Sequence, residues 1–299
     1  MITIRPAVGP DVETAVRLLM QQVPVADRQL RVANALASAA HGELILDDLL
    51  IGYRSEEPVG AILTVIQPGQ TASVWPPEVA NGDDEMADAL VAAAVRHLEA
   101  AGVTIIQSIL EPEDLSGRKL LTRNGIVYLT DLLFMERNLD HSWPQETRPP
   151  LESVVYSTGT HDRFVALLEQ SYRATLDCPE LDGIRTAEQA LASHRAAGRF
   201  AAETWRLYCI DNVDAGVLLL SEHPDQRAWE LVYMGVGPSY RGQGLGWRML
   251  LDALPKLPRS DADTVFLAVD SRNRYASATY ERLGFSALAT RALHLHMRP

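Results

Sequence analysis

A glycine-rich turn between an apolar strand and an apolar helix constrains this chain most. Residues 236–246 read Val-Gly-Pro-Ser-Tyr-Arg-Gly-Gln-Gly-Leu-Gly, and residues 247–254 continue as an apolar run. Gly242, Gly244 and Gly246 lack the Cβ atoms that would keep a bulky anion away from the backbone. The amides of the loop and first helical turn, with the helix dipole, then form an anion site suited to a pyrophosphate. The spacing Arg-x-x-Gly-x-Gly is neither the Walker pattern nor the dinucleotide-binding pattern.

A second motif follows a plausible buried strand at residues 265–269. Residues 273–285 read Asn-Arg-Tyr-Ala-Ser-Ala-Thr-Tyr-Glu-Arg-Leu-Gly-Phe. In order and spacing, the two blocks resemble the GNAT acyltransferases, which pair a coenzyme A loop, Arg/Gln-x-x-Gly-x-Gly/Ala, with a later block, Asn-x-x-Ala-x-x-x-Tyr-x-x-x-Gly-Phe. The resemblance is specific across residues 230–285. It implies an enzyme that moves an acetyl group from acetyl-CoA directly to an amine of a small molecule.

Length and composition bound the remaining possibilities. The chain has 299 residues, enough for two domains, and a formal net charge of −12. This charge argues against non-specific binding to nucleic acid, and it is compatible with a cationic substrate as well as with simple solubility. The two cysteines show no metal-ligand spacing, so no metal is expected. No apolar run is long enough for a membrane span and no signal peptide is recognisable. The two cysteines suggest no disulfide framework, so we expect a cytoplasmic protein, as a monomer or homodimer.

The order of predicted elements repeats on either side of a proline-containing linker at residues 140–151. Short strands alternate with helices in both halves, which indicates an α/β fold with a mixed sheet covered by helices. Among the expected elements are a strand at residues 43–46, a helix at residues 162–175 and a final strand at residues 286–297. We therefore predict two tandem GNAT-like domains. Residues 1–139 form a degenerate domain without a coenzyme A loop, and residues 152–299 form the domain with the acetyl-CoA site.

The two predicted domains differ at the phosphate loop. The matching stretch of the first half, residues 74–85, has one glycine, no arginine and three acidic residues at the start of a helix. Such acids stabilise a helix N-terminus but repel a pyrophosphate. The first domain is therefore expected to be structural.

The resemblance also implies which residues bind the donor. In the family the sheet splays beside the strand before the phosphate loop, and the pantetheine arm pairs with its backbone. Three of these positions have a second interpretation without a ligand. Gly235 also fits an ordinary bulge, Arg241 a surface salt bridge, and Asn273 a helix cap. The cofactor-binding residues implied are Met234, Gly235, Val236, Arg241, Gly242, Gln243, Gly244, Leu245, Gly246 and Asn273.

Catalysis needs an acid for the departing thiolate and a route for the proton of the amine. Tyr280 matches the family tyrosine that protonates the sulfur, although a packing tyrosine fits the same position. Glu230 matches a catalytic glutamate of some members, but a solvent-exposed strand glutamate fits equally. Strand alternation places Glu230 on the same face as Met234 unless a bulge intervenes. Other members use a glutamate at the position of Ala268, so that version requires Asp270 to substitute.

Substrate recognition is expected in residues 171–185. Asp177, Glu180 and Asp182 are candidates to hold an ammonium group, and turn and capping chemistry explains them equally well. Cys178 is not expected to act as a nucleophile, because transfer in this family is direct. Two rival functions remain: a non-catalytic acyl-CoA-binding sensor, and acetylation of peptides or proteins.

Overall fold

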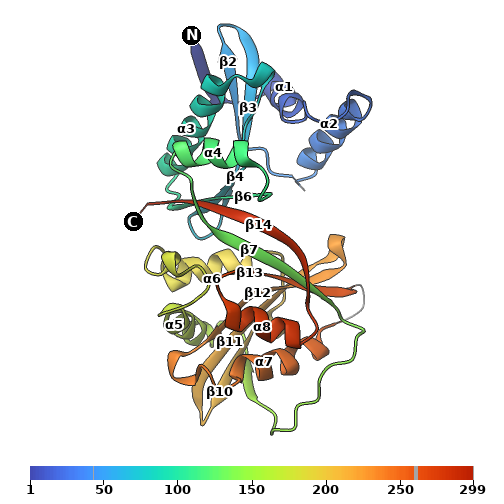
Figure 1. Cartoon of the computed structure of the whole chain (residues 1–299), viewed down its shortest axis with the longest axis vertical. Coiled ribbons are helices and arrows are strands. Elements are labelled where there is room, and N and C mark those ends of the chain that lie inside the picture. Colours follow the sequence, from blue (N-terminus) through green and yellow to red (C-terminus); the bar gives the residue numbers. More distant parts are fainter. Residues whose placement is uncertain (43, 259–261, 299) are drawn as a thin grey trace. The chain divides into compact units, whose positions relative to one another are not determined.

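The computed structural model describes residues 1–42, 44–258 and 262–298 (Figure 1). By its internal contacts the chain divides into two compact units. Unit 1 comprises Met1–Leu129 and Ala292–Pro299, and unit 2 comprises Thr130–Arg291. The two points of division, at residues 129/130 and 291/292, fall inside the strands Val127–Asn138 and Ser286–Met297. They differ from the domain boundaries predicted from the sequence at residues 139 and 152, and those boundaries stay a prediction.

Unit 1 is a mixed sheet with helices packed on it. Its strand order is β1-β2-β3-β4-β6-β14, and the last six residues of β14 lie antiparallel to β6. Its elements are β1 (Ile2–Pro6), α1 (Pro10–Leu19), α2 (Val25–Ala40), β2 (Asp48–Arg54), β3 (Glu57–Gln67), β4 (Thr71–Val74), β5 (Glu78–Val79), α3 (Asp84–Ala100), β6 (Ile105–Leu110) and α4 (Leu115–Arg123).

Helix α3 forms the centre of one core cluster of unit 1. Its face of Met86, Leu90 and Leu98 is buried against the sheet. The helix begins where the Asp83 side chain accepts a hydrogen bond from the Met86 amide at 3.1 Å. The acidic start of α3 thus caps its own helix, as the sequence predicted.

Unit 2 has the same plan of a sheet between helices. Its strand order is β14-β7-β13-β12-β11-β10-β8. Its elements are β7 (Val127–Asn138, from Thr130 on), β8 (Glu152–Val155), α5 (His161–Tyr172), α6 (Ala187–Arg195), β9 (Arg199–Phe200), β10 (Arg206–Ile210), β11 (Val213–His223), β12 (Ala228–Val236), α7 (Leu245–Ala253), β13 (Thr264–Asp270), α8 (Arg274–Arg282) and β14 (Ser286–Met297, to Arg291).

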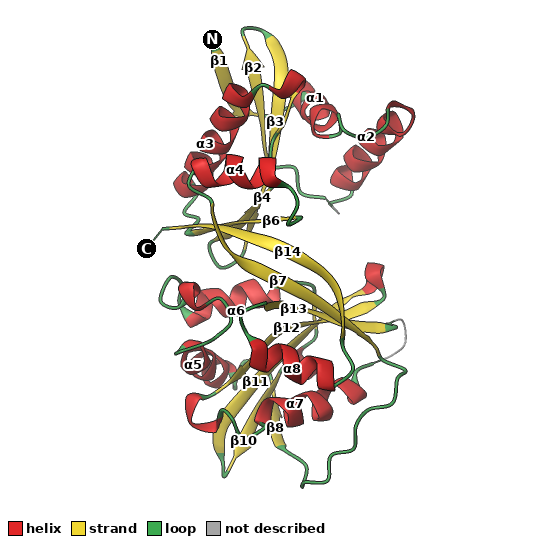
Figure 2. Ribbon diagram, in the orientation of Figure 1, coloured by secondary structure: helices red, strands yellow, loops and turns green. Residues whose placement is uncertain are grey.

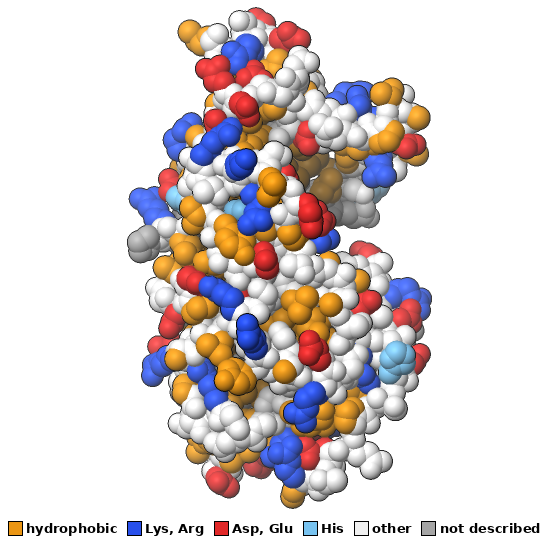
Figure 3. Space-filling view, in the orientation of Figure 1, with side chains coloured by type: hydrophobic (Ala, Val, Ile, Leu, Met, Phe, Trp, Pro, Cys, Tyr) orange, Lys and Arg blue, Asp and Glu red, His pale blue; other side chains and the backbone are white. Residues whose placement is uncertain are grey.

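The two faces of the unit 2 sheet carry different helices (Figure 2). Alternate residues of β11 separate the layers: Leu218 joins a core cluster with α7 and α8, whereas Val217 joins a cluster with α5 and α6. The predicted mixed α/β architecture is therefore confirmed. On the face drawn in Figure 3, basic and acidic side chains are interspersed within each unit.

The parallel pairing of β12 with β13 is short. It joins Ala228–Glu230 to Thr264–Phe266, and among the described residues no further pairing links the two strands. Residue 231 onward of β12 and residue 267 onward of β13 therefore diverge. This divergence opens the sheet at the end of β12 that leads into the glycine-rich turn.

Candidate active site

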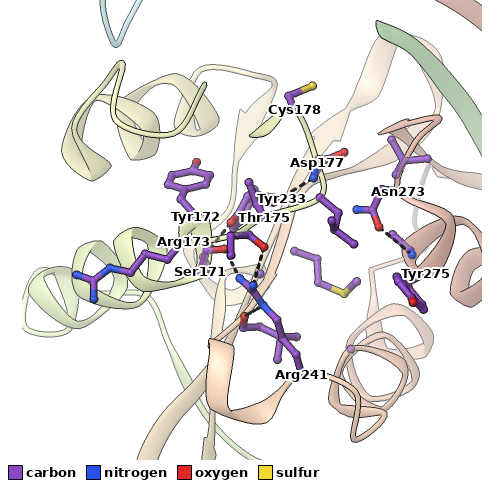
Figure 4. A pocket seen from close by; sticks show the side chains of 18 of the residues that line it. Ser171, Tyr172, Arg173, Thr175, Asp177, Cys178, Tyr233, Arg241, Asn273 and Tyr275 are labelled. Carbon is purple, nitrogen blue, oxygen red and sulfur yellow. Dashed lines mark hydrogen bonds between the residues drawn. The ribbon is translucent and has the colours of Figure 1, made fainter. Parts of the chain in front are cut away.

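A cavity of about 1370 Å³ lies in unit 2 where β12 and β13 diverge. Its walls come from the second half of β12, the end of β13, the segment after α5, the glycine-rich turn and the exposed side of α8. Figure 4 shows these walls, with Tyr172 on one side and Asn273 on the other. Most of the residues 171–185 that the sequence singled out line this cavity.

A bulge in β12 shapes the cavity. Leu219 pairs with Tyr233 and Leu220 pairs with Leu231, so Val232 is the extra residue. Past the bulge, Met234 packs on the α7 side, whereas Glu230 lies on the opposite face from Leu231. The condition attached to the sequence prediction is therefore met: the bulge intervenes, and Glu230 and Met234 do not share a face.

The glycine-rich turn is built as an amide cradle. Gly242 and Gly244 both have φ of +74°, in the left-handed region that favours glycine, and α7 begins at Leu245. A Cβ on Gly242 would meet no atom within 4 Å, so its cavity side is open. The first amides of a helix have no partner within the helix. These amides and the helix dipole suit an anion, and all but Gln243 of the predicted loop residues line the cavity.

Arg241 and Gln243 use their side chains to hold protein backbone. The guanidinium of Arg241 donates to the carbonyls of Ser171 at 2.8 Å, Ala174 at 2.9 Å and Val236 at 3.0 Å (Figure 4). Gln243 donates from its side chain to the Ser239 carbonyl. Arg241 therefore ties the end of β12 to the end of α5, which neither the predicted phosphate contact nor the surface salt bridge described.

Gly235 is required by close packing. A Cβ there would lie 2.5 Å from Ser171 Oγ and 2.8 Å from Tyr233 Cε1. Ser171 Oγ in turn shares a 2.8 Å hydrogen bond with Tyr233 Oη. The absent side chain lets α5 lie directly against β12, so Gly235 is more than an ordinary strand glycine.

A wall of aromatic side chains continues from Tyr233. Its ring is stacked on His194, with centroids 5.1 Å apart, and His194 Nε2 shares a 3.0 Å hydrogen bond with Tyr172 Oη. Burial lowers the pKa of His194 to about 3, and the charge of Arg185 acts in the same direction, so the ring is neutral at neutral pH. Sequence reasoning did not single out His194 or Tyr233. For Tyr233 the available signal was an aromatic within the strand that precedes the phosphate loop.

Asn273 immediately precedes α8, and Tyr280 lies on it. Asn273 caps the helix, because its Oδ1 accepts from the Ala276 amide at 3.2 Å, and it also lines the cavity. Tyr280 is 6% exposed and lines the cavity. Burial raises the pKa of Tyr280, and the nearby charge of Asp177 acts in the same direction. The phenol is therefore protonated at neutral pH and available as a hydrogen-bond donor.

The three acidic residues proposed to bind the substrate differ in whether they line the cavity. Asp177 and Asp182 line the cavity, whereas Glu180 does not. Glu180 instead pairs with Arg272 through contacts of 2.7 and 2.9 Å. Arg272 also pairs with the buried Asp270 at 2.6 Å. Glu180 thus fastens the segment to the end of β13.

Asp177, Cys178 and Asp270 are joined by hydrogen bonds from backbone amides to side-chain carboxylates. The Asp270 amide donates to Asp177 Oδ1 at 2.8 Å, and the Cys178 amide donates to Asp270 Oδ2 at 3.1 Å. Burial raises the pKa of the Cys178 thiol, so it is not activated as a nucleophile. Burial also acts to raise the pKa of Asp270, but Arg272 and other donors outweigh it and the pKa is lowered. Asp270 is therefore a poor substitute base.

Glu230 lies away from the cavity lining. Its Oε2 shares a 2.8 Å hydrogen bond with His223 Nε2, and both side chains are half-buried. Neither residue is among those that line the cavity. If Glu230 acted as the base, it would do so from outside the residues that line the cavity.

Within residues 1–42, 44–258 and 262–298, no three His, Cys, Asp or Glu side chains gather closely enough to hold a metal ion. Across the same residues, every helix is too short or too polar for a membrane span.

Comparisons with known proteins agree with this geometry. Residues 165–285 match the family model described as Acetyltransferase (GNAT) family. The chain is 28% identical to mycothiol acetyltransferase of Mycobacteroides abscessus over 311 aligned positions, which cover 92% of this chain and 99% of the relative.

Solved structures with the same fold cover the whole chain. A GCN5-related N-acetyltransferase from Sphaerobacter thermophilus superposes with a TM-score of 0.64 at 17% identity, covering 100% of this chain and 96% of that one. A tandem GNAT protein from the clavulanic acid biosynthesis pathway gives 0.55 at 16% identity, covering 100% and 99%. At these identities the likeness shows the fold, and it is a tandem GNAT fold.

Proposed function

Because residues 165–285 form an acetyltransferase domain of the GNAT family, we propose that this N-acetyltransferase moves the acetyl group of acetyl-CoA to a primary amine of a small molecule. One observation carries the proposal. The cavity has the amide cradle of the glycine-rich turn at one side and the carboxylate of Asp177 among its lining groups, beside diverging strands.

The part of the cavity proposed to bind acetyl-CoA suits a pyrophosphate followed by an extended pantetheine arm. The open left-handed glycines and the start of α7 supply amides for the anion. Met234, Gly235 and Val236 line the cavity where β13 has moved away, so their backbone lies beside the space for the arm. Arg241 holds this backbone through Val236, and Asn273 lines the same cavity. Bound there, acetyl-CoA would supply the activated acetyl group.

Tyr280 is the proposed acid. Its phenol lies in the cavity wall and stays protonated at neutral pH. In this proposal its Oη donates a proton to the departing sulfur. Cys178 has no covalent role in this scheme, since burial keeps its thiol protonated.

Asp177 and Asp182 are the proposed anchors for the ammonium form of the acceptor. Both line the cavity, and neither forms an ion pair with a basic side chain in the described part of the chain. The relative from Mycobacteroides abscessus is named for mycothiol, which supports a small molecule rather than a protein as acceptor. The first-half domain remains proposed as a structural partner without a coenzyme A loop.

A thiol-release assay tests this function. Purified full-length protein and acetyl-CoA are mixed with D-glucosamine, tyramine or putrescine, and free thiol and acetylated amine are measured. The proposal predicts that at least one amine accelerates thiol release and gains an acetyl group stoichiometrically. Tight binding of acetyl-CoA without acceleration by any amine would favour an acyl-CoA sensor. Acetylation of peptides in preference to all three amines would favour a protein acetyltransferase.

A further inference from the structure

The glycine-rich turn, where the proposed acetyl-CoA places its phosphates, has an arginine that is already engaged. Coenzyme A carries a diphosphate and a 3′-phosphate, and arginine is the side chain that pairs best with such groups. Each of the three guanidinium nitrogens of Arg241 donates to a backbone carbonyl instead. Arg282 lines the cavity from α8, with its Cζ 4.5 Å from the centroid of the Trp247 ring. The turn itself, residues 236–246, therefore supplies no free cation.

The segment between β7 and β8, predicted as a linker, is fastened to the same part of unit 2. Figure 2 draws this segment as a long loop. Two of its side chains, Trp143 and Leu151, pack against the core cluster that includes residues of α7. Between them, the carbonyl of Pro149 accepts a hydrogen bond from Arg248 of α7 at 2.7 Å. The segment is thus held against the first turns of the helix that follows the glycine-rich turn.

Arg148 of this segment has one guanidinium nitrogen beside the turn. Glu146 holds one edge of the guanidinium, because its carboxylate accepts from Arg148 Nε at 2.9 Å and from Nη2 at 2.7 Å. The remaining nitrogen, Nη1, has no acceptor among the described residues. A Cβ on Gly244 would lie 3.7 Å from this Nη1, and Gly244 also lines the large cavity. Glu146 therefore orients Arg148 and leaves its free N–H groups where the cavity meets the turn.

The charges around Arg148 leave a positive excess beside the turn. Hydrogen bonds from Arg148 lower the pKa of Glu146 to about 2, and the charge of Arg248 acts in the same direction. One ionised carboxylate therefore faces two arginines. Lys256 and Asp252, which line the same small cavity as these three residues, pair with each other and cancel. The Nε of Arg248 is buried without a hydrogen-bond partner in the described part of the chain. Such a local excess in a chain of net charge −12 favours an anionic ligand.

We propose that Arg148 binds a phosphate group of the acetyl donor through Nη1, an assignment that rests on the proposed acetyl transfer. Arg148 is then a donor-binding residue, and it takes no part in the proton transfers. The phosphate is the diphosphate on the amide cradle or the 3′-phosphate on the ribose, since both offer the same kind of oxygen to an arginine. The segment that joins the two predicted domains thereby becomes part of the acetyl-CoA site.

Calorimetric titration with two donors tests the assignment. Wild type and Arg148→Gln are each titrated with acetyl-CoA and with 3′-dephospho-acetyl-CoA at about 0.15 M salt, where exposed charges more than roughly 8 Å apart are largely screened. Arg148→Lys keeps the charge. The double variant Glu146→Gln, Arg148→Gln removes the glutamate charge that the single variant leaves unpaired. Lys256→Gln is the matched control, because this cation of the same small cavity is already paired with Asp252.

The expected loss follows from one charge-assisted hydrogen bond near solvent. The Arg148 side chain is 45% exposed, so Arg148→Gln and the double variant should bind acetyl-CoA roughly tenfold more weakly than wild type. Arg148→Lys should recover part of the loss, and Lys256→Gln should stay within about twofold of wild type. Urea unfolding of each variant should show an intact fold, because exposed ion pairs contribute little to stability.

The two donors identify the phosphate that Arg148 binds. A loss that disappears with the dephospho donor assigns Arg148 to the 3′-phosphate, and an equal loss with both donors assigns it to the diphosphate. Wild-type affinity of Arg148→Gln for both donors, or recovery of wild-type affinity in the double variant, would overturn the assignment and leave the proposed function standing. A wild type that binds neither donor overturns both.

Discussion

Replacement of Arg272 by alanine would leave a buried carboxylate without its cation. The side chain of Asp270 is 0% exposed, and its oxygens contact Arg272 at distances from 2.6 to 3.0 Å. Breaking a buried ion pair from one side costs about 3–5 kcal/mol. Arg272 is itself 43% exposed, so solvent screens the pair, and the Thr130 hydroxyl and Cys178 amide still donate to Asp270. We therefore expect a loss of about 3 kcal/mol in the free energy of unfolding, at the lower end of that range.

The matched control is Arg227→Ala. Arg227 pairs with Asp263 through contacts of 2.8 and 3.0 Å, but both side chains are mostly exposed. Exposed pairs contribute little to stability because solvent and salt screen them. Arg227→Ala is therefore expected to leave the free energy of unfolding essentially unchanged.

Urea unfolding followed by tryptophan fluorescence measures the difference. Trp205 and Trp229 are buried in unit 2, the unit that contains Asp270, so their emission reports its unfolding. Because Arg272 holds the pKa of Asp270 below its ordinary value, the stabilisation is complete at neutral pH and is lost as pH falls through the lowered pKa. The gap between wild type and Arg272→Ala should narrow on acidification. Equal stability of the two alanine variants at pH 7 would refute the reasoning.

Three further predictions concern single side chains. Tyr280→Phe should lower kcat by roughly a hundredfold or more while calorimetry finds acetyl-CoA affinity unchanged, because only the proton donor is removed; an unaltered kcat would exclude Tyr280 as the acid. Cys178→Ser should change kcat by less than about twofold, since burial keeps the thiol protonated; a large loss would point to covalent catalysis. Gly235→Ala should destabilise the protein by about 1–3 kcal/mol through overlap with Ser171. Adding Ser171→Gly should recover part of that loss in urea unfolding, and strict additivity of the two changes would contradict the contact.

Local sequence patterns predicted the elements of unit 2 well. The expected final strand at residues 286–297 coincides with β14, and the expected helix at residues 162–175 corresponds to α5 (His161–Tyr172). These segments have strong periodicity and clear boundary residues, which act over short range. In unit 1 the strand expected at residues 43–46 is wrong for 44–46, where the chain is irregular, and residue 43 lies outside the described part. The helix Val25–Ala40 was not predicted, although its alanine-rich composition favours a helix.

The same patterns could not predict which strands pair with each other. Residues 132–138 of β7 belong to the first half of the sequence but pair with β13 in unit 2, as Val269 opposite Leu133 illustrates. Conversely, the last residues of β14 pair with β6 in unit 1. Both strands read as ordinary apolar strands, and periodicity records which residues are buried but not which strand lies alongside.

At the candidate site, sequence motifs located the loop and helix but not the uses of their side chains. The left-handed glycines follow from the motif, because only glycine adopts that backbone without strain. Arg241 binds three carbonyls and Glu180 binds Arg272, and both partnerships join segments far apart in the chain. The bulge at Val232 likewise depends on register with β11. Such long-range contacts decide which acids reach the cavity.

Calorimetric titration of acetyl-CoA tests the account most directly, with Gly246→Glu and Gly246→Gln as the paired variants. A Cβ at Gly246 would meet Met234 Cε at 3.5 Å, an ordinary contact, so a Cβ at this position displaces no neighbour. The glutamate adds a negative charge beside the amides proposed to bind the pyrophosphate, and the glutamine has the same size without the charge. The account predicts that wild type binds acetyl-CoA, that Gly246→Gln binds it more weakly and that Gly246→Glu does not bind it. Equal affinity of wild type and Gly246→Glu would contradict the placement of the donor at this turn.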